Sequence, residues 1–197
     1  MTAIFQPLAI ILHLINTRLC AIGRAIGVVA IAAMVIAILI QVFFRYVLNN
    51  ALPWPDEAAR FCMLWMTGLM APTAFRRGGF VAIDTLNSML PKGISSLLNL
   101  FLLIVCLLVL VVAIQIGWKE VNGIGGRFTS ASLYLPMSFA FDEWFRLPRS
   151  WMMYSLVVGL VMLILVNIEL IVRQIVQLFG TDIVLPTIPD SEVGGAE

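Results

Sequence analysis

Residues 93–118 read GISSLLNLFLLIVCLLVLVVAIQIGW, a run of 26 residues that contains no Asp, Glu, Lys, Arg or His. A helix rises about 1.5 Å per residue, so about 20 apolar residues cross the roughly 30 Å of hydrocarbon in a bilayer. A helix also satisfies its own backbone hydrogen bonds, which is necessary where no water is present to do so. The run therefore predicts a transmembrane helix in an integral membrane protein.

Three further runs lack charged residues, with lengths of 20, 15 and 19 residues, and they are Ala25–Phe44, Phe61–Phe75 and Ser150–Ile168. The middle run is too short to span alone, so we expect its helix to start at Pro55. Proline suits the first helical position, and Asp56 and Glu57 favour the first turn electrostatically. We therefore predict an all-α membrane protein with interfacial helices and four transmembrane helices at about 25–44, 55–75, 93–118 and 150–170.

The segments around these spans divide the chain into three parts. In residues 1–24, apolar side chains recur on one helical face, namely Leu8, Ile11, Leu12, Ile15 and Leu19, with His13, Asn16 and Arg18 as polar members. This pattern predicts an interfacial helix or an extension of the first span. Residues 25–176 form the four-helix membrane domain, and we expect 177–197 to be a disordered acidic tail. The long 119–149 connection should lie in the interface or pack on another subunit.

The composition excludes several function classes. Hydrophobic residues make up 61% of the chain and charged residues 12%, about half the charged share of soluble domains. A net charge of +1 without a basic stripe argues against a nucleic-acid partner. One histidine, His13, and three cysteines without C-x-x-C spacing are too few ligands for haem or a metal centre. We expect no enzyme activity, no catalytic or metal-binding residues and no cofactor.

Two polar features leave alternatives open. Glu169 is either a proton carrier inside the membrane or half of an interfacial ion pair with Arg173 at i+4. A self-sufficient, homo-oligomeric small carrier or channel remains the alternative function. In that case the polar side chains within the spans would line its path, and they are Gln41, Asn99, Gln115 and Asn167.

Small residues and a basic turn suggest how the helices meet and end. Gly23, Gly27 and Ala30 are spaced to let a second helix approach closely. Arg76 and Arg77 suit the C-terminus of a helix, and the following Gly78-Gly79 can adopt a left-handed cap. Asp84 is positioned to begin a short helix that Pro91 would stop.

Three segments that flank the first two predicted spans carry a family pattern when taken together. They are Phe44-Arg-Tyr-Val-Leu-Asn-Asn50, Pro53-Trp-Pro-Asp-Glu-Ala-Ala-Arg60 and Arg76-Arg-Gly-Gly-Phe-Val-Ala-Ile-Asp84. This combination resembles the small membrane subunit, the Q or DctQ-type component, of tripartite ATP-independent periplasmic (TRAP) transporters. The resemblance covers roughly residues 25–170, and its specific part is Arg45–Asp84. Phe80 stands where the family often has a histidine, so no imidazole role carries over.

The resemblance implies a scaffold subunit in the bacterial inner membrane. Its partners would be a large, sodium-coupled, multi-span subunit and a periplasmic substrate-binding protein that delivers an organic acid anion. Basic residues are divided six to six between the two sides, but Arg18 and Arg24 beside the first span and the short basic Arg76–Lys92 loop favour both termini in the cytoplasm. The resemblance also implies a periplasmic hairpin cluster and a cytoplasmic turn. The cluster consists of Arg45, Asn49, Trp54, Asp56, Glu57 and Arg60, and the turn of Arg76, Arg77, Gly78, Gly79 and Asp84. Arg45 would pair with the acidic residues, or each residue would anchor independently at the interface.

Overall fold

The computed structural model describes residues 2–78, 91–136 and 144–179. Its elements, in chain order, are α1 (Thr2–Tyr46), α2 (Trp54–Arg76), α4 (Lys92–Asn122), α5 (Ile124–Arg127), β1 (Thr129–Pro136), β2 (Trp144–Pro148) and α6 (Ser150–Phe179). The expectations for Gly79, Asp84 and the tail beyond Phe179 lie outside the described residues.

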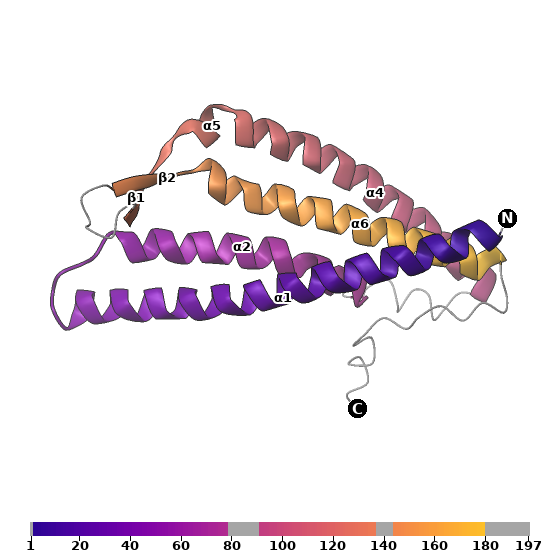
Figure 1. Cartoon of the computed structure of the whole chain (residues 1–197), viewed down its shortest axis with the longest axis horizontal. Coiled ribbons are helices and arrows are strands. Elements are labelled where there is room, and N and C mark those ends of the chain that lie inside the picture. Colours follow the sequence, from indigo (N-terminus) through magenta and orange to yellow (C-terminus); the bar gives the residue numbers. More distant parts are fainter. Residues whose placement is uncertain (1, 79–90, 137–143, 180–197) are drawn as a thin grey trace.

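Four long helices make up most of the molecule, side by side in the order α1, α2, α6, α4 (Figure 1). Helix α6 is central, because it contacts α1, α2 and α4. We call the end where α1 connects to α2 the hairpin end. The opposite end, which holds the start of α1 and the end of α6, is the terminal end (Figure 1).

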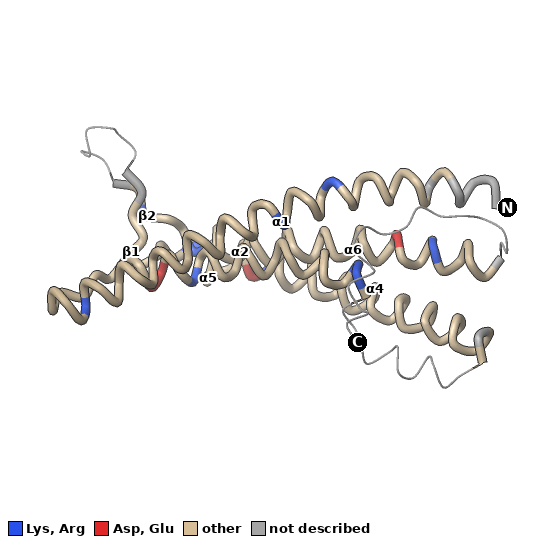
Figure 2. The backbone as a smooth tube through the Cα atoms, turned by 90° about the horizontal axis from the view of Figure 1, so that it is seen from below, with Lys and Arg blue, Asp and Glu red and all other residues tan. Residues whose placement is uncertain are grey.

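Three helices in the described chain are long and apolar enough to cross a membrane, and they span Ala9–Tyr46, Gly93–Asn122 and Ser150–Leu178. The predicted apolar helices are thus confirmed, whereas the count of four is not reached. Helix α2 falls short because it is the least apolar of the four long helices, and charged residues lie near both of its ends. Figure 2 shows that most of the backbone, drawn in tan, carries neither acidic nor basic residues, and that the charged residues of α6 lie near one of its ends.

Helix α1 runs without a break for 45 residues, about 67 Å at the helical rise. Residues 2–24 are therefore part of the same continuous helix as the first predicted span. The predicted apolar face points outward, since Ile11 and Ile15 are 54% and 46% exposed. The buried positions of this part recur at spacings of four and three, and they are Ala9, His13, Asn16, Cys20, Gly23 and Gly27. Small and polar residues face the protein, because lipid is as apolar as the exposed isoleucines.

Glycines set two close helix contacts. A Cβ on Gly23 would lie 2.9 Å from the carbonyl oxygen of Leu69, so α1 and α2 approach closely there. A Cβ on Gly159 of α6 would lie 2.6 Å from the carbonyl oxygen of Gly68 in α2. Gly68 in turn packs against the backbone of Ser155. The spacing of small residues predicted the α1 contact face, but the α2–α6 crossing was missed.

The 119–149 connection contains a strand pair that the all-α prediction did not include. Strands β1 and β2 are antiparallel, with Tyr134 opposite Arg146 and Thr129 opposite Pro148. The register shifts between Thr129 and Tyr134, which indicates a bulge in β1. We call this strand pair, β1 and β2, the arm. It lies at the hairpin end, beside the start of α2 (Figure 1).

Candidate functional sites at the two ends of the bundle

A buried ionic cluster joins three helices toward the terminal end, and its centre is Glu169 of α6, which is 0% exposed. From α2, Arg76 donates through Nη2 to Oε1 of Glu169 (2.7 Å) and through Nε to Oε2 (3.0 Å). Arg173 donates through Nε to Oε1 (3.1 Å), and Asn16 of α1 donates through Nδ2 to Oε2 (2.8 Å). Four donors therefore surround one carboxylate.

His13 of α1 completes this cluster as an acceptor. Its Nδ1 lies 2.9 Å from Nη2 of Arg76 and 2.6 Å from Nη2 of Arg173. A guanidinium group can only donate, so we assign the lone pair to Nδ1 and the proton to Nε2, and the 3.3 Å between Nδ1 and Oε1 of Glu169 is then a contact without a hydrogen bond. Thr17 links the same groups, because its hydroxyl donates to the carbonyl oxygen of His13 (2.7 Å) and accepts from Nη1 of Arg76 (2.9 Å).

This geometry favours a structural role for Glu169. The predicted ion pair with Arg173 is confirmed at 3.1 Å. The bidentate partner Arg76 and the amide of Asn16 were missed, because they come from distant helices. A carboxylate held by two guanidinium groups and an amide is stabilised in its charged form, which is unfavourable for a group that must take up and release protons.

The predicted basic turn divides between this cluster and the surface. Arg76 is 5% exposed and belongs to the cluster, whereas Arg77 is exposed and caps the end of α2. Gly78 has φ +80°, the left-handed conformation expected of a glycine cap. The signal that could have located the cluster is the polar set His13, Asn16 and Thr17 at i, i+3 and i+4 of an apolar helix.

At the hairpin end, Glu57 attaches the arm to the first turn of α2. Its Oε1 accepts from the backbone N–H of Ala131 (3.1 Å), and its Oε2 accepts from that of Ser132 (2.6 Å). One carboxylate therefore satisfies two successive donors of β1. Asp56 and Arg60, which the sequence placed in the same cluster, are both exposed.

The ion pair expected between Arg45 and the acidic residues is not found in the described part of the chain. The guanidinium carbon of Arg45 instead lies 5.8 Å from the centre of the Tyr46 ring. Glu57 accepts hydrogen bonds from the backbone N–H groups of β1, so its partner is the arm and not, as the hypothesis had it, Arg45. Asn49 has φ +49°, so it forms the left-handed position in the turn between α1 and α2.

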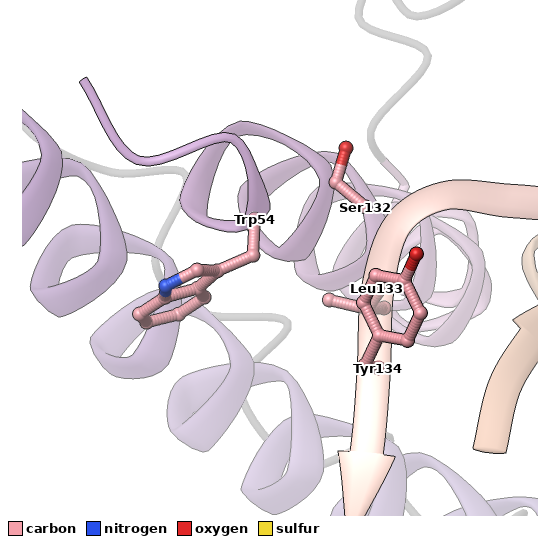
Figure 3. A pocket seen from close by; sticks show the side chains of 4 residues that line it. All are labelled: Trp54, Ser132, Leu133 and Tyr134. Atoms are coloured by element: carbon pink, nitrogen blue, oxygen red, sulfur yellow. The ribbon is translucent and has the colours of Figure 1, made fainter. Parts of the chain in front are cut away.

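A pocket of about 670 Å³ lies between α2 and the arm. Figure 3 shows its lining, in which the Leu133 side chain points toward Trp54, and the lining residues are Trp54, Ser132, Leu133 and Tyr134. The guanidinium carbon of Arg146 lies 5.0 Å from the centre of the Tyr134 ring. The pocket is therefore apolar inside and carries a positive charge beside it.

Two of the polar residues considered for a transport path, Asn167 and Gln115, lie in different surroundings. Asn167 is 0% exposed, and in its hydrogen-bonding orientation it donates to the carbonyl oxygen of Leu103 in α4 (3.2 Å). Gln174 donates to Oγ of Ser96 in α4 (2.7 Å). Gln115 lies on the exposed side of α4, beside a surface cavity of about 440 Å³. No cluster of His, Cys, Asp or Glu among the described residues could hold a metal ion.

These observations define a class, a helical membrane protein whose buried charges at the terminal end pair with one another. Residues 34–177 match the family described as "Tripartite ATP-independent periplasmic transporters, DctQ component". The match covers well over half of the chain, so the protein belongs to this family and is a component of a TRAP transporter. This confirms the resemblance drawn from the sequence. None of the curated proteins compared with the chain matches it.

Proposed function

We propose that this chain is the small scaffold subunit that supports a large, ion-coupled membrane subunit. The proposal rests on the hydrogen bonds of Glu169. Both of its carboxylate oxygens accept hydrogen bonds, from Arg76, Arg173 and Asn16, in the described structure. Ionisable residues inside a membrane are usual marks of ion and proton paths. Here the one buried carboxylate of the described spans serves helix packing, so the coupling ion and the substrate belong on another chain.

In this proposal α2 is the fourth span. Its 23 residues correspond to about 34 Å, enough to cross the hydrocarbon. Both termini then lie on one side, which we place in the cytoplasm of a bacterial cell, and the hairpin end faces the periplasm. Basic residues are divided six to six between the two sides, so this orientation rests on the family.

The hairpin end helps to dock a periplasmic substrate-binding protein that delivers an organic acid anion. Support comes from the arm and the start of α2, which lie farther out than the start of α6 (Figure 1). Sodium coupling and substrate choice are functions of the large subunit in this proposal.

The test is purification of the tagged chain from native membranes in mild detergent, with co-purifying proteins identified by mass spectrometry. A stoichiometric large multi-span partner is the expected result. The alternative, a self-sufficient homo-oligomeric carrier, predicts that the chain purifies alone and transports substrate in liposomes. That outcome would overturn the scaffold proposal.

A further inference from the structure

We propose that the pocket between α2 and the arm receives an apolar side chain that lies next to a carboxylate on the soluble periplasmic partner. This inference rests on the proposed function, because it assumes that the hairpin end docks such a partner. It adds the position of the contact and the chemistry of the partner's surface.

The lining suits the insertion of a side chain. Trp54 and Tyr134 provide aromatic surface, and Leu133 points into the space toward Trp54 (Figure 3). Tryptophan and tyrosine are enriched among the residues that carry most of the energy of protein interfaces. A volume of about 670 Å³ is large enough for an aromatic or long aliphatic side chain.

The position of the pocket favours a soluble partner over lipid. The arm and the start of α2 lie beyond the level at which α6 begins (Figure 1). Two charged side chains in the first turns of α2, Asp56 and Arg60, are exposed near this region. Charged side chains are costly in hydrocarbon, so this part of the chain belongs in water or among headgroups.

Part of the β1 backbone is not available for pairing with a partner strand. A partner strand would need free N–H groups along the edge of the arm. Glu57 already accepts from the N–H groups of Ala131 and Ser132. Insertion of a side chain does not need these two groups, and Glu57 holds the strand that carries Leu133.

The charge beside the pocket indicates the chemistry of the residue next to the inserted side chain. Arg146 lies across from Tyr134 in the strand register, with its guanidinium group over the ring. Among the described residues, no carboxylate lies within ion-pair distance of Arg146. A guanidinium group pairs best with a carboxylate through two parallel hydrogen bonds. The complementary surface is therefore an apolar side chain with an acidic neighbour.

The first test measures the affinity of the periplasmic binding protein for the purified membrane complex in nanodiscs. We expect Trp54→Ala and Leu133→Ser each to weaken docking about tenfold or more. The control is Trp151→Ala, because Trp151 is similarly exposed (46% against 39% for Trp54) but lies outside the pocket lining. Its affinity should change less than about twofold.

Co-purification of the large subunit is measured for each variant, so that the two proposals fail separately. If the wild-type chain retains no large subunit, the proposed function is wrong. If the complex assembles, the binding protein docks, and both pocket variants bind as tightly as wild type, the pocket proposal is overturned while the scaffold proposal stands.

A second test addresses the carboxylate. We expect Arg146→Glu to weaken docking, with a loss that shrinks as salt rises from about 50 to about 500 mM, because salt screens charges at an interface. The control is Arg127→Glu, an exposed arginine at the end of α5. Equal effects of the two variants, or tighter docking by Arg146→Glu, would overturn the assignment of an acidic partner.

Discussion

Arg76 at the end of α2 and Glu169 in α6 are 93 residues apart in the chain, yet two nitrogens of Arg76 lie 2.7 and 3.0 Å from the two carboxylate oxygens. Both side chains are buried. The same carboxylate accepts from Asn16, so this single pair fixes where α1, α2 and α6 meet. A buried ion pair is costly to form, and removing one partner leaves a charge without compensation. Loss of either partner should therefore destabilise the packing of the three helices.

The first prediction concerns this pair. Arg76→Gln should destabilise the protein by about 3–5 kcal/mol, because Glu169 loses its bidentate partner in a buried site. The control is Arg18→Gln, since Arg18 is exposed on α1 near the same end of the molecule. Thermal unfolding in detergent, followed by tryptophan fluorescence, measures the difference. Equal unfolding temperatures for the two variants would show that the pair does not hold the helices.

A double variant separates charge from packing. Replacing both partners by leucine removes the isolated charge, so Arg76→Leu with Glu169→Leu should lose less stability than the sum of the single changes. Additive losses would contradict coupling between the two side chains. The measurement is the same unfolding experiment.

The long helices were predictable from the sequence because lipid imposes a simple rule, about 20 residues without charge. Their faces were not. The apolar pattern around Ile11 and Ile15 predicted an interfacial helix or an extension of the first span, and it did not locate the face that packs on the other helices, since these side chains point outward. The repeat of His13, Asn16, Cys20 and Gly23 carried the correct information, since small and polar residues mediate contacts between membrane helices.

The sites were predictable only in part. Arg76 and Glu57 were singled out from local patterns at helix ends, and both have structural partners. Their partners come from other elements, Glu169 in α6 and the N–H groups of β1. Spacing along a chain specifies contacts within one helix, but it cannot say which helix a side chain will meet. The strand pair was not predicted for a similar reason, because the contacts of β1 with β2 and with Glu57 join segments that are far apart in the chain or irregular in register.

The second prediction tests the crossing of α2 and α6. Gly159→Ala should destabilise the protein by about 1–3 kcal/mol, because its Cβ would lie 2.6 Å from the carbonyl oxygen of Gly68. Gly117→Ala in α4 is the matched control, since its nearest neighbour would be 3.5 Å away, an ordinary contact. Alanine favours helix over glycine, so Gly117→Ala should be neutral or slightly stabilising. Equal losses of thermal stability in the two variants would contradict the close crossing.

The third prediction tests the attachment of the arm. In Glu57→Gln, both N–H groups of β1 lose their charged acceptor, because one then meets a neutral amide oxygen and the other an NH2 group that cannot accept. Hydrogen bonds to charged groups contribute about 1.5–3 kcal/mol, and amide exchange in peptides that contain Ala131 and Ser132 should accelerate roughly tenfold or more. Asp56→Asn, at the exposed neighbouring position, should leave exchange in β1 unchanged. Unchanged exchange in Glu57→Gln would mean that the carboxylate does not hold the strand.

The fourth prediction decides the number of spans. If α2 crosses the membrane, the two termini lie on one side and the turn at Asn49 lies on the other. If only the three most apolar helices cross, the termini lie on opposite sides.

We expect a fluorescent protein fused after Glu197 to fold in the cytoplasm, and alkaline phosphatase inserted after Asn49 to be active in the periplasm. Activity of alkaline phosphatase at both positions would exclude the fourth span, because the C-terminus and the turn would then share a compartment. A membrane-spanning α2 also has to accommodate the charged residues at its ends. Asp56 and Glu57 would lie in a headgroup layer, and Arg76 would lie in a headgroup layer or in the buried pair with Glu169.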